Sequence, residues 1–192
     1  MKRVCVFCSS SPKIPQVYFD AAKELANSLV KANYGLVYGG GSVGLMGCLA
    51  DEFIKLNGEV IGVIPDFMVE VEWQHQGVKD MRKTKTMSER KKMMVDLSDA
   101  VIALPGSTGT LDELFEVMSD KKLGLLHKPL ILLNTNHFYD HLIAQLQIMV
   151  DESFMRQTHM DRMFVANTPQ EAVEHCSFVD QEPLQLTDAA VK

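Results

Sequence analysis

The sequence has no long hydrophobic run. Nowhere in its 192 residues do apolar side chains approach the ~18 in succession that a membrane-spanning helix needs. Residues 1–7 lead directly into a strand-like pattern and hold no hydrophobic segment of the kind found in signal peptides. We therefore expect a cytoplasmic protein without a membrane partner.

Cysteine is scarce, and metal-ligand spacings are few. The four cysteines lack the paired spacing of a disulfide framework, and in a reducing compartment they would remain thiols. Cys5 and Cys8 have the spacing of a redox or metal pair, but alternation along a strand sends them to opposite faces, and no second pair exists. His137 and His141 share a helix face, yet nothing nearby adds a further ligand. We expect no metal site.

A Gly-Lys-Ser/Thr phosphate loop is also absent, which argues against nucleoside triphosphate hydrolysis. The formal charge of −6 disfavours a general nucleic-acid binder. One basic stretch, interrupted only by Asp80 and Glu89, predicts either a solvated helix flank or a site for a small anionic ligand. Its seven basic residues are Lys79, Arg82, Lys83, Lys85, Arg90, Lys91 and Lys92.

Short apolar runs alternate with longer amphipathic segments along the chain. The expected strands are Arg3–Phe7, Leu36–Tyr38, Val60–Ile64, Ala100–Leu104 and Pro129–Leu133, with a weaker one at Met163–Ala166. The expected helices are Val17–Lys31, Leu45–Leu56, Met87–Leu97, Leu111–Lys122, Phe138–Val150 and Gln170–Cys176. This pattern predicts an α/β fold in which helices cover both faces of a doubly wound parallel sheet.

The length and the 46% hydrophobic content suit one domain with a substantial core. We place that domain at residues 1–180. Weak periodicity in residues 181–192 predicts a tail that is flexible or docks on a partner subunit.

Three loops rich in glycine and serine follow strands of the expected sheet. In an open sheet wound in the order 3-2-1-4-5, ligands bind at the carboxyl ends of strands 1 and 4, where the winding reverses. Residues 8–12 follow the first strand, residues 39–47 the second and residues 105–110 the fourth. The three loops should therefore line one cleft.

The loop at residues 105–110 leads straight into the helix expected at Leu111–Lys122. A helix N-terminus offers free N–H groups and a partial positive charge to a phosphate, and Thr108 and Thr110 add hydroxyl groups. The alternative is a capping box, in which Glu113 reaches back to the amide of Thr110 only to start the helix.

The loop at residues 39–47 formally matches a dinucleotide-binding pattern through Gly39, Gly41 and Gly44, with Asp66 as the following acid. It follows the second strand rather than the first, however, and a second glycine-rich loop shares the cleft. The glycines could also serve a tight turn and close helix packing. We favour a pocket for a monophosphate and its sugar, shared by both loops.

Arg90 falls on the apolar stripe that Met87, Met94 and Leu97 form on their helix. A guanidinium on a buried face needs a partner, which is either a carboxylate or a ligand anion. Trp73, the only tryptophan, either stacks on a base or takes part in ordinary packing.

These motifs resemble the Lonely Guy (LOG) family of phosphoribohydrolases, long mislabelled as lysine decarboxylases. The family signature Pro-Gly-Gly-x-Gly-Thr-x-x-Glu stands here as Pro105-Gly106-Ser107-Thr108-Gly109-Thr110-Leu111-Asp112-Glu113. Its companion, Met-x-Glu-Arg-Lys, stands as Met87-Ser88-Glu89-Arg90-Lys91. The likeness includes Cys8-Ser9-Ser10-Ser11, Gly39-Gly40-Gly41 and Gly44-Leu45-Met46-Gly47, and it extends to about Phe154. A cofactor-anchoring site for decarboxylation is not found.

The resemblance implies a Rossmann-like fold and a homodimer or larger assembly. It implies an enzyme that hydrolyses AMP or a cytokinin riboside 5′-monophosphate to the free base and ribose 5-phosphate, without a cofactor. Arg90 and Glu113 match the catalytic pair. The residues expected to contact the nucleotide are Ser9, Gly40, Gly41, Gly44, Glu72, Lys91, Gly106, Ser107, Thr108, Gly109, Thr110 and Asp112.

Cleavage of a C–N glycosidic bond passes through a sugar with oxocarbenium character, which a carboxylate can stabilise while it activates water. Glu113 would take this role, Arg90 would orient Glu113 or polarise the departing base, and the loop amides with Thr110 would hold the phosphate. Competing hypotheses are a nucleotide or cofactor carrier without catalysis and a nicotinamide-dependent oxidoreductase.

Two departures from the family pattern leave the preferred base and the turnover open. Ser107 replaces the second glycine of the signature and adds a Cβ where the backbone passes close to the nucleotide. Ser119-Asp120-Lys121-Lys122 stands where the family commonly has Thr-Trp-x-Gln.

Overall fold

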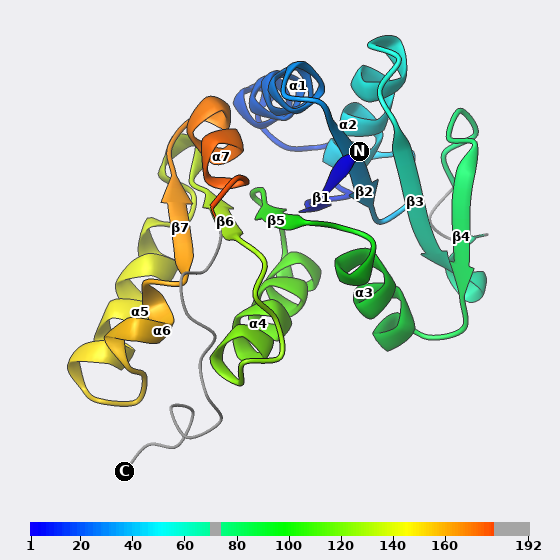
Figure 1. Cartoon of the computed structure of the whole chain (residues 1–192). Coiled ribbons are helices and arrows are strands. Elements are labelled where there is room, and N and C mark those ends of the chain that lie inside the picture. Colours follow the sequence, from blue (N-terminus) through cyan, green and yellow to red (C-terminus); the bar gives the residue numbers. More distant parts are fainter. Residues whose placement is uncertain (70–73, 179–192) are drawn as a thin grey trace.

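The structure, a computed structural model, describes residues 1–69 and 74–178, and in these ranges seven strands form one parallel sheet (Figure 1). The strands are β1 (Lys2–Phe7), β2 (Tyr34–Tyr38), β3 (Val60–Pro65), β4 (Asp80–Thr84), β5 (Ala100–Ala103), β6 (Leu130–Leu133) and β7 (Met163–Ala166). Their order across the sheet is β4-β3-β2-β1-β5-β6-β7. The predictions for Glu72, Trp73 and the tail at residues 181–192 lie outside the described residues.

Helices connect the strands. They are α1 (Gln16–Lys31), α2 (Gly44–Lys55), α3 (Met87–Asp96), α4 (Thr108–Lys122), α5 (Asp140–Asp151), α6 (Gln157–Met160) and α7 (Pro169–His175), with 3₁₀ turns at η1 (Asp66–Met68) and η2 (Thr135–His137). None of these described helices is long and apolar enough to cross a membrane. The predicted Rossmann-like α/β fold is confirmed, and the predicted order 3-2-1-4-5 corresponds to the central strands β3-β2-β1-β5-β6.

Strand β4 was not predicted. Residues Asp80–Thr84 lie in the basic stretch, for which a solvated helix flank is one of the two predictions. That prediction is wrong for these five residues, because they form a strand that pairs in parallel with β3. β4 lies at the edge of the sheet, and of its five residues only Thr84 is buried. An edge strand of this kind carries no apolar alternation that a sequence pattern would reveal.

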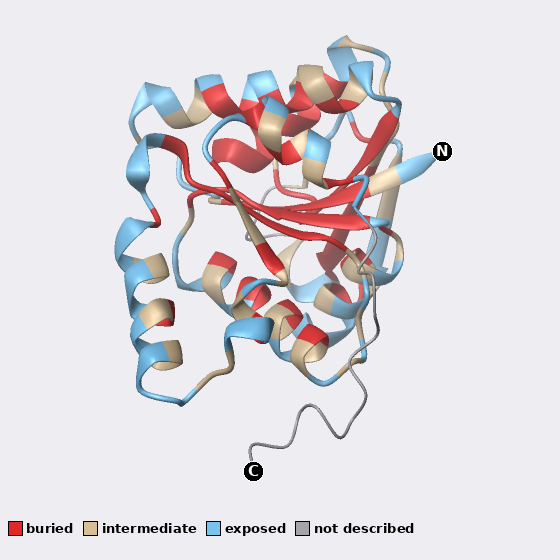
Figure 2. Cartoon of the chain, turned by 60° about the vertical axis from the view of Figure 1, so that its left-hand side comes forward, coloured by how far each residue is buried: buried red, intermediate tan, exposed pale blue. Residues whose placement is uncertain are grey.

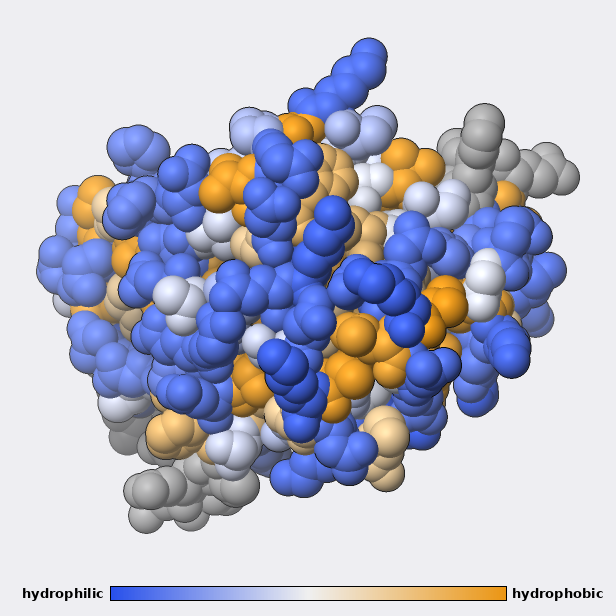
Figure 3. Space-filling view, turned by 90° about the horizontal axis from the view of Figure 1, so that it is seen from above, coloured by the Kyte–Doolittle hydropathy of each residue, from blue (hydrophilic) through white to orange (hydrophobic). Residues whose placement is uncertain are grey.

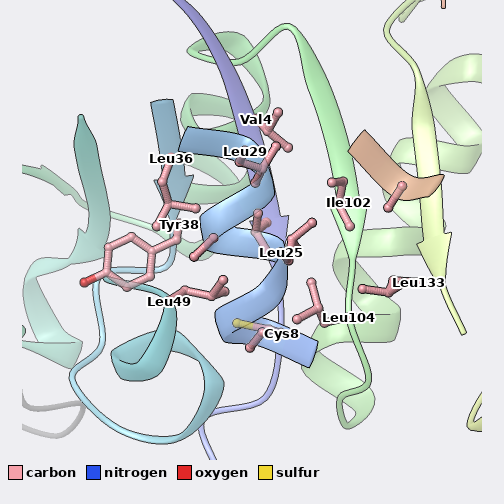
Figure 4. Packing of buried hydrophobic residues seen from close by; sticks show 14 of the residues in the cluster. Val4, Cys8, Leu25, Leu29, Leu36, Tyr38, Leu49, Ile102, Leu104 and Leu133 are labelled. Atoms are coloured by element: carbon pink, nitrogen blue, oxygen red, sulfur yellow. The ribbon is translucent and has the colours of Figure 1, made fainter. Parts of the chain in front are cut away.

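The core consists of two layers, one on each face of the sheet. Val4, Leu36 and Ile102 pack against Leu25 of α1 and Leu49 of α2 on the first face (Figure 4). On the second face, the side chains that meet the sheet come from α3, α4 and α5 and include Met94, Leu114 and Leu146. Buried residues accordingly occupy the sheet and the inward sides of the helices, while the outward sides are exposed (Figure 2).

The outer surface agrees with the charged composition of the chain. In the view of Figure 3, hydrophilic side chains dominate, and hydrophobic side chains lie in smaller groups between them. Scattered apolar groups of this kind are normal on a folded protein.

The first turn of α2 is fixed against the loop that follows β1. The amide of Leu45 donates a hydrogen bond to the carbonyl oxygen of Ser9 at 2.9 Å. Gly44 has a φ of +66°, and a Cβ at this position would lie 2.6 Å from the carbonyl oxygen of Ser10. Only glycine therefore fits where the loops after β1 and β2 meet.

We expect Gly44→Ala to lower the free energy of unfolding by about 1–3 kcal/mol, because it adds both a left-handed alanine and a backbone clash. Gly109→Ala is the matched control: Gly109 lies in α4, and a Cβ there would meet no atom within 4 Å. That control should be neutral or more stable by about 0.5–1 kcal/mol. Urea unfolding measures both, and equal stability of the two variants would contradict the packing argument.

Candidate functional site

A cavity of about 90 Å³ lies at the carboxyl ends of the central strands, where the chain winding reverses between β1 and β5. All three predicted loops contribute to it, so the expectation that they line one cleft is confirmed. Helix α3 adds a cation and helix α4 an acid. The polar and glycine lining consists of Ser9, Ser10, Gly39, Arg90, Ser107, Gly109, Thr110 and Glu113, beside the thiol of Cys8.

Arg90 reaches this cavity because of how α3 begins. The side chain of Thr86 accepts a hydrogen bond from the amide of Glu89 at 3.1 Å, and the Glu89 carboxylate accepts one from the amide of Lys85 at 2.8 Å. These two bonds satisfy amides that would otherwise lack a partner at the helix start. Glu89 of the Met-x-Glu-Arg-Lys motif therefore caps α3 and fixes the direction of the following Arg90.

Arg90 is buried, with 5% of its surface exposed, and it joins three parts of the fold. Its Nε donates to the carbonyl oxygen of Val63 at 3.1 Å, and its Nη2 donates to the carbonyl oxygen of Gly39 at 2.9 Å. Its Nη1 lies 3.7 Å from Oε1 of Glu113, which is 8% exposed. The sequence left open whether the partner of Arg90 is a carboxylate or a ligand, and the structure supplies the carboxylate.

Glycine stands at positions around the cavity for different physical reasons. A Cβ at Gly39 would overlap with Nη2 of Arg90, and a Cβ at Gly106 would overlap with the hydroxyl group of Thr110. These two glycines are required by protein contacts. Gly109 also lines the cavity, but a Cβ there would meet no protein atom within 4 Å. Protein packing therefore does not account for glycine at position 109, whereas close approach of a ligand to the backbone would.

The start of α4 rules out the capping-box alternative. The N-cap residue is Ser107, and α4 begins at Thr108, so Thr110 lies inside the first turn and Glu113 is too far along to close a box. The amides of Thr108, Gly109 and Thr110 have no intrahelical acceptor and form a site suited to an anion. The hydroxyl group of Ser107 makes no capping hydrogen bond.

Ser107 fits its position without backbone strain. Its φ of −92° and ψ of −163° are extended values that any residue adopts. The Cβ that replaces the family's second glycine therefore costs nothing in backbone conformation.

Among the described residues, the other predicted contacts are not part of the cavity lining. The Nζ of Lys91 donates to Oδ2 of Asp112 at 2.9 Å. The carbonyl oxygen of Gly40 accepts a hydrogen bond from the amide of His75 at 3.1 Å, and Gly41 pairs with Gln74 in an isolated antiparallel bridge. Gly44 and Gly106 leave room for close contacts within the protein, with the backbone of Ser10 and the side chain of Thr110 respectively.

Sequence reasoning places the loop that contains Cys8 at the cleft but does not name Cys8 as a contact, and it misses Glu116 as a second partner of Lys91. Burial raises the pKa of the Cys8 thiol, which therefore stays protonated at neutral pH. Glu116 lies one helical turn after Asp112, so the spacing alone offered a signal for a shared partner. In residues 1–69 and 74–178, no group of three His, Cys, Asp or Glu side chains is arranged to hold a metal ion.

Fold and site together define an α/β protein in which a helix N-terminus suited to an anion lies beside a buried arginine–glutamate pair. The family model described as "Possible lysine decarboxylase" matches residues 46–176. The probable cytokinin riboside 5′-monophosphate phosphoribohydrolase LOGL2 of Oryza sativa subsp. japonica is 43% identical, covering 90% of this chain and 71% of the relative. Cytokinin riboside 5′-monophosphate phosphoribohydrolase LOG3 of Arabidopsis thaliana is 41% identical, covering 90% and 80%. The chain belongs to the LOG family.

Solved structures share the fold. The molybdenum cofactor binding protein of Rippkaea orientalis superimposes with a TM-score of 0.69 at 23% identity, covering 91% of this chain and 94% of that one. The molybdenum cofactor carrier protein of Chlamydomonas reinhardtii gives a TM-score of 0.69 at 20% identity, covering 90% and 94%. At this identity the likeness establishes the fold alone.

Arg90→Met should lower the free energy of unfolding by about 3–5 kcal/mol, because it removes the buried cation from Glu113 and from two carbonyl groups. The control is Arg82→Met, whose exposed guanidinium pairs with Asp80 on the edge strand and should matter little. Chemical denaturation monitored by circular dichroism measures both. Similar stability of the two variants would show that Arg90 does not hold the site together.

Proposed function

We propose that this chain hydrolyses the N-glycosidic bond of a nucleoside 5′-monophosphate, releasing the free base and ribose 5-phosphate. The substrates are a cytokinin riboside 5′-monophosphate, which the names of the curated relatives state, and AMP. The observation that carries the proposal is the buried pair of Arg90 and Glu113, which lines one cavity with the N-terminus of α4.

The helix N-terminus receives the phosphate. The amides at the start of α4 and the hydroxyl group of Thr110 supply hydrogen bonds, and the helix dipole adds a partial positive charge. The cavity of about 90 Å³ is smaller than the roughly 300–1,000 Å³ of complete small-molecule pockets. It therefore holds the phosphate and the reacting part of the sugar, and the remainder of the nucleotide lies beyond it.

Glu113 acts on the sugar. As the C–N bond breaks, positive charge develops at the anomeric carbon, and a nearby carboxylate stabilises that charge while it takes a proton from the attacking water. The oxygen of the water bonds to the anomeric carbon as the C–N bond breaks. The departing base takes a proton from solvent, and Glu113 returns the proton it has taken to solvent, so that the carboxylate is regenerated. Arg90, fixed by Val63 and Gly39, lies 3.7 Å from the Glu113 carboxylate and orients it. No step of this scheme uses a metal or an organic cofactor.

We also infer a homodimer or larger assembly in the cytoplasm. Three apolar side chains on α4 and just after it, Phe115, Leu123 and Leu125, are exposed and suit burial against a second copy. The cysteines of the described residues are free thiols, as expected in a reducing compartment.

A carrier that binds a phosphorylated ligand without cleaving it is the second candidate, since the two solved structures named above bind or carry a cofactor on this fold. Product formation distinguishes the two functions. A carrier would bind the nucleotide and return it unchanged.

Glu113→Gln should lower turnover by roughly 10²–10⁴-fold while AMP binding largely survives, because the amide keeps the shape but removes the base. Turnover is followed as release of free base, and AMP binding by calorimetry. A thermal melt of the variant separates this outcome from unfolding. Turnover within about twofold of the unsubstituted protein would remove Glu113 from the mechanism.

Gly109→Ala should leave the fold intact but weaken AMP binding by about tenfold or more, because its Cβ occupies space next to the phosphate amides. The stability measured for the same variant excludes a folding defect as the cause. Unchanged AMP affinity would place the phosphate elsewhere.

A further inference from the structure

The turn that follows β6 lies against the loop that leads into α4. Strands β5 and β6 are neighbours in the sheet, so the segments after their carboxyl ends lie side by side. The hydroxyl group of Tyr139, just before α5, donates a hydrogen bond to the carbonyl oxygen of Leu104 at 2.7 Å. Leu104 opens the loop at residues 104–107, whose last residue is the N-cap of α4. The phenol therefore contacts the segment that places the first turn of α4.

Tyr139 lies behind this loop rather than inside the cavity. Its side chain is 2% exposed and packs in the core on the second face of the sheet, while other residues line the cavity. Burial raises the pKa of the Tyr139 phenol and outweighs the amide of Gly106, which donates to the same oxygen and lowers that pKa. The phenol is therefore protonated at neutral pH and serves as a donor.

The loop at residues 104–107 packs closely against the start of α4. A Cβ at Gly106 would overlap with the hydroxyl group of Thr110, so the backbone at Gly106 touches a side chain that should bind the phosphate. On its other side, the loop begins with the amide of Leu104, which donates to the carbonyl oxygen of Phe7 at 2.9 Å. A shift of this closely packed loop would therefore move Thr110 and the free amides of the first turn of α4.

A buried amide side chain holds Tyr139 in place. Asn134, which is 6% exposed, directly follows β6, and its backbone amide donates to the carbonyl oxygen of Ala166 at 2.8 Å. Its Oδ1 accepts a hydrogen bond from the amide of Tyr139, and its Nδ2 donates to Oδ1 of Asp140, both at 2.7 Å. Asn134 thus ties the start of α5 to the end of β6, and the sheet fixes the position of Tyr139.

The turn between Asn134 and Tyr139 has a strained backbone. Asn136 and His137 have φ values of +53° and +60°, in the left-handed region that disfavours residues with a Cβ. Such values persist only where surrounding contacts hold the backbone in place. Here the hydrogen bonds of Asn134 and Tyr139 hold both ends of the turn. The strain therefore accompanies a fixed position of the phenol beside the loop that starts α4.

We propose that Tyr139, held by Asn134, is a positioning residue for phosphate binding: its hydroxyl group fixes the loop at residues 104–107 and with it the phosphate donors at the start of α4. The inference rests on the proposed binding of the phosphate at this helix N-terminus. It gives a role in the site to the turn after β6, which lies outside both family motifs.

Tyr139→Phe keeps the ring and removes the donor. Because the loop loses this contact, the Kd for ribose 5-phosphate and the KM for AMP should rise by about tenfold or more, the effect of weakening one charge-assisted hydrogen bond. The kcat should fall by less than about threefold, since a contact made equally in ground and transition states changes KM alone. The affinity for adenosine, which lacks the phosphate, should change by less than about twofold. Calorimetry gives the affinities, and release of free base gives kcat and KM.

The matched control is Tyr38→Phe, the same change at a buried tyrosine on the first face of the sheet. Within the part of the chain that the structure describes, the hydroxyl group of Tyr38 has no hydrogen-bond partner. Its removal should leave the affinity for ribose 5-phosphate within about twofold. A second variant, Asn134→Ala, removes the acceptor of the Tyr139 amide and should raise the Kd for ribose 5-phosphate by about three- to tenfold. A thermal melt of each variant shows whether it is folded at the assay temperature.

Two results would overturn the proposal. One is an affinity for ribose 5-phosphate in folded Tyr139→Phe within about twofold of that of the unsubstituted protein. The other is an equal loss of affinity for ribose 5-phosphate and for adenosine, a pattern that indicates general damage to the cavity rather than a displaced phosphate site.

The same measurements separate this proposal from the proposed hydrolysis. If the unsubstituted protein binds ribose 5-phosphate but cleaves no nucleotide, the hydrolysis fails, and the calorimetric comparison still decides the role of Tyr139. If it binds neither ribose 5-phosphate nor AMP, the phosphate site itself is wrong, and the role of Tyr139 falls with it.

Discussion

The buried guanidinium of Arg90 is the constraint on which the site depends. A charge removed from water must find partners. Arg90 donates to the carbonyl groups of Gly39, just after β2, and of Val63 in β3, and it forms an ion pair with the carboxylate of Glu113. Gly39 has no side chain because the guanidinium occupies that space. The same contacts hold α3 and α4 at the carboxyl ends of the central strands, beside the cavity.

Fold alone does not separate an enzyme of this kind from a carrier. The molybdenum cofactor proteins share the architecture at low sequence identity, whereas the curated relatives share about two fifths of the sequence. The argument for catalysis comes from the arrangement of the residues in the site. A carboxylate held next to a helix N-terminus that suits a phosphate is placed to act on the sugar that joins the phosphate to a base.

Much of this arrangement could be read from the sequence. Continuous apolar runs predicted β1, β2, β3, β5 and β6, because these strands are covered on both faces, but polar β4 at the edge gave no such signal. Spacing alone could not decide whether Glu113 caps a helix or faces Arg90, since that depends on where α4 begins. It also could not show that Asp112 and Glu116 occupy the ammonium group of Lys91, which is a tertiary contact between helices.

The most direct test of the account is the identity of the products formed from N6-isopentenyladenosine 5′-monophosphate and from AMP without added metal. Chromatography with mass detection follows base, nucleoside, nucleotide and sugar phosphate together. The account predicts free base and ribose 5-phosphate in equal amounts. Nucleoside with inorganic phosphate would show cleavage at the wrong bond, and an intact nucleotide that raises the melting temperature of the protein would indicate a carrier. Either result would contradict the proposed hydrolysis.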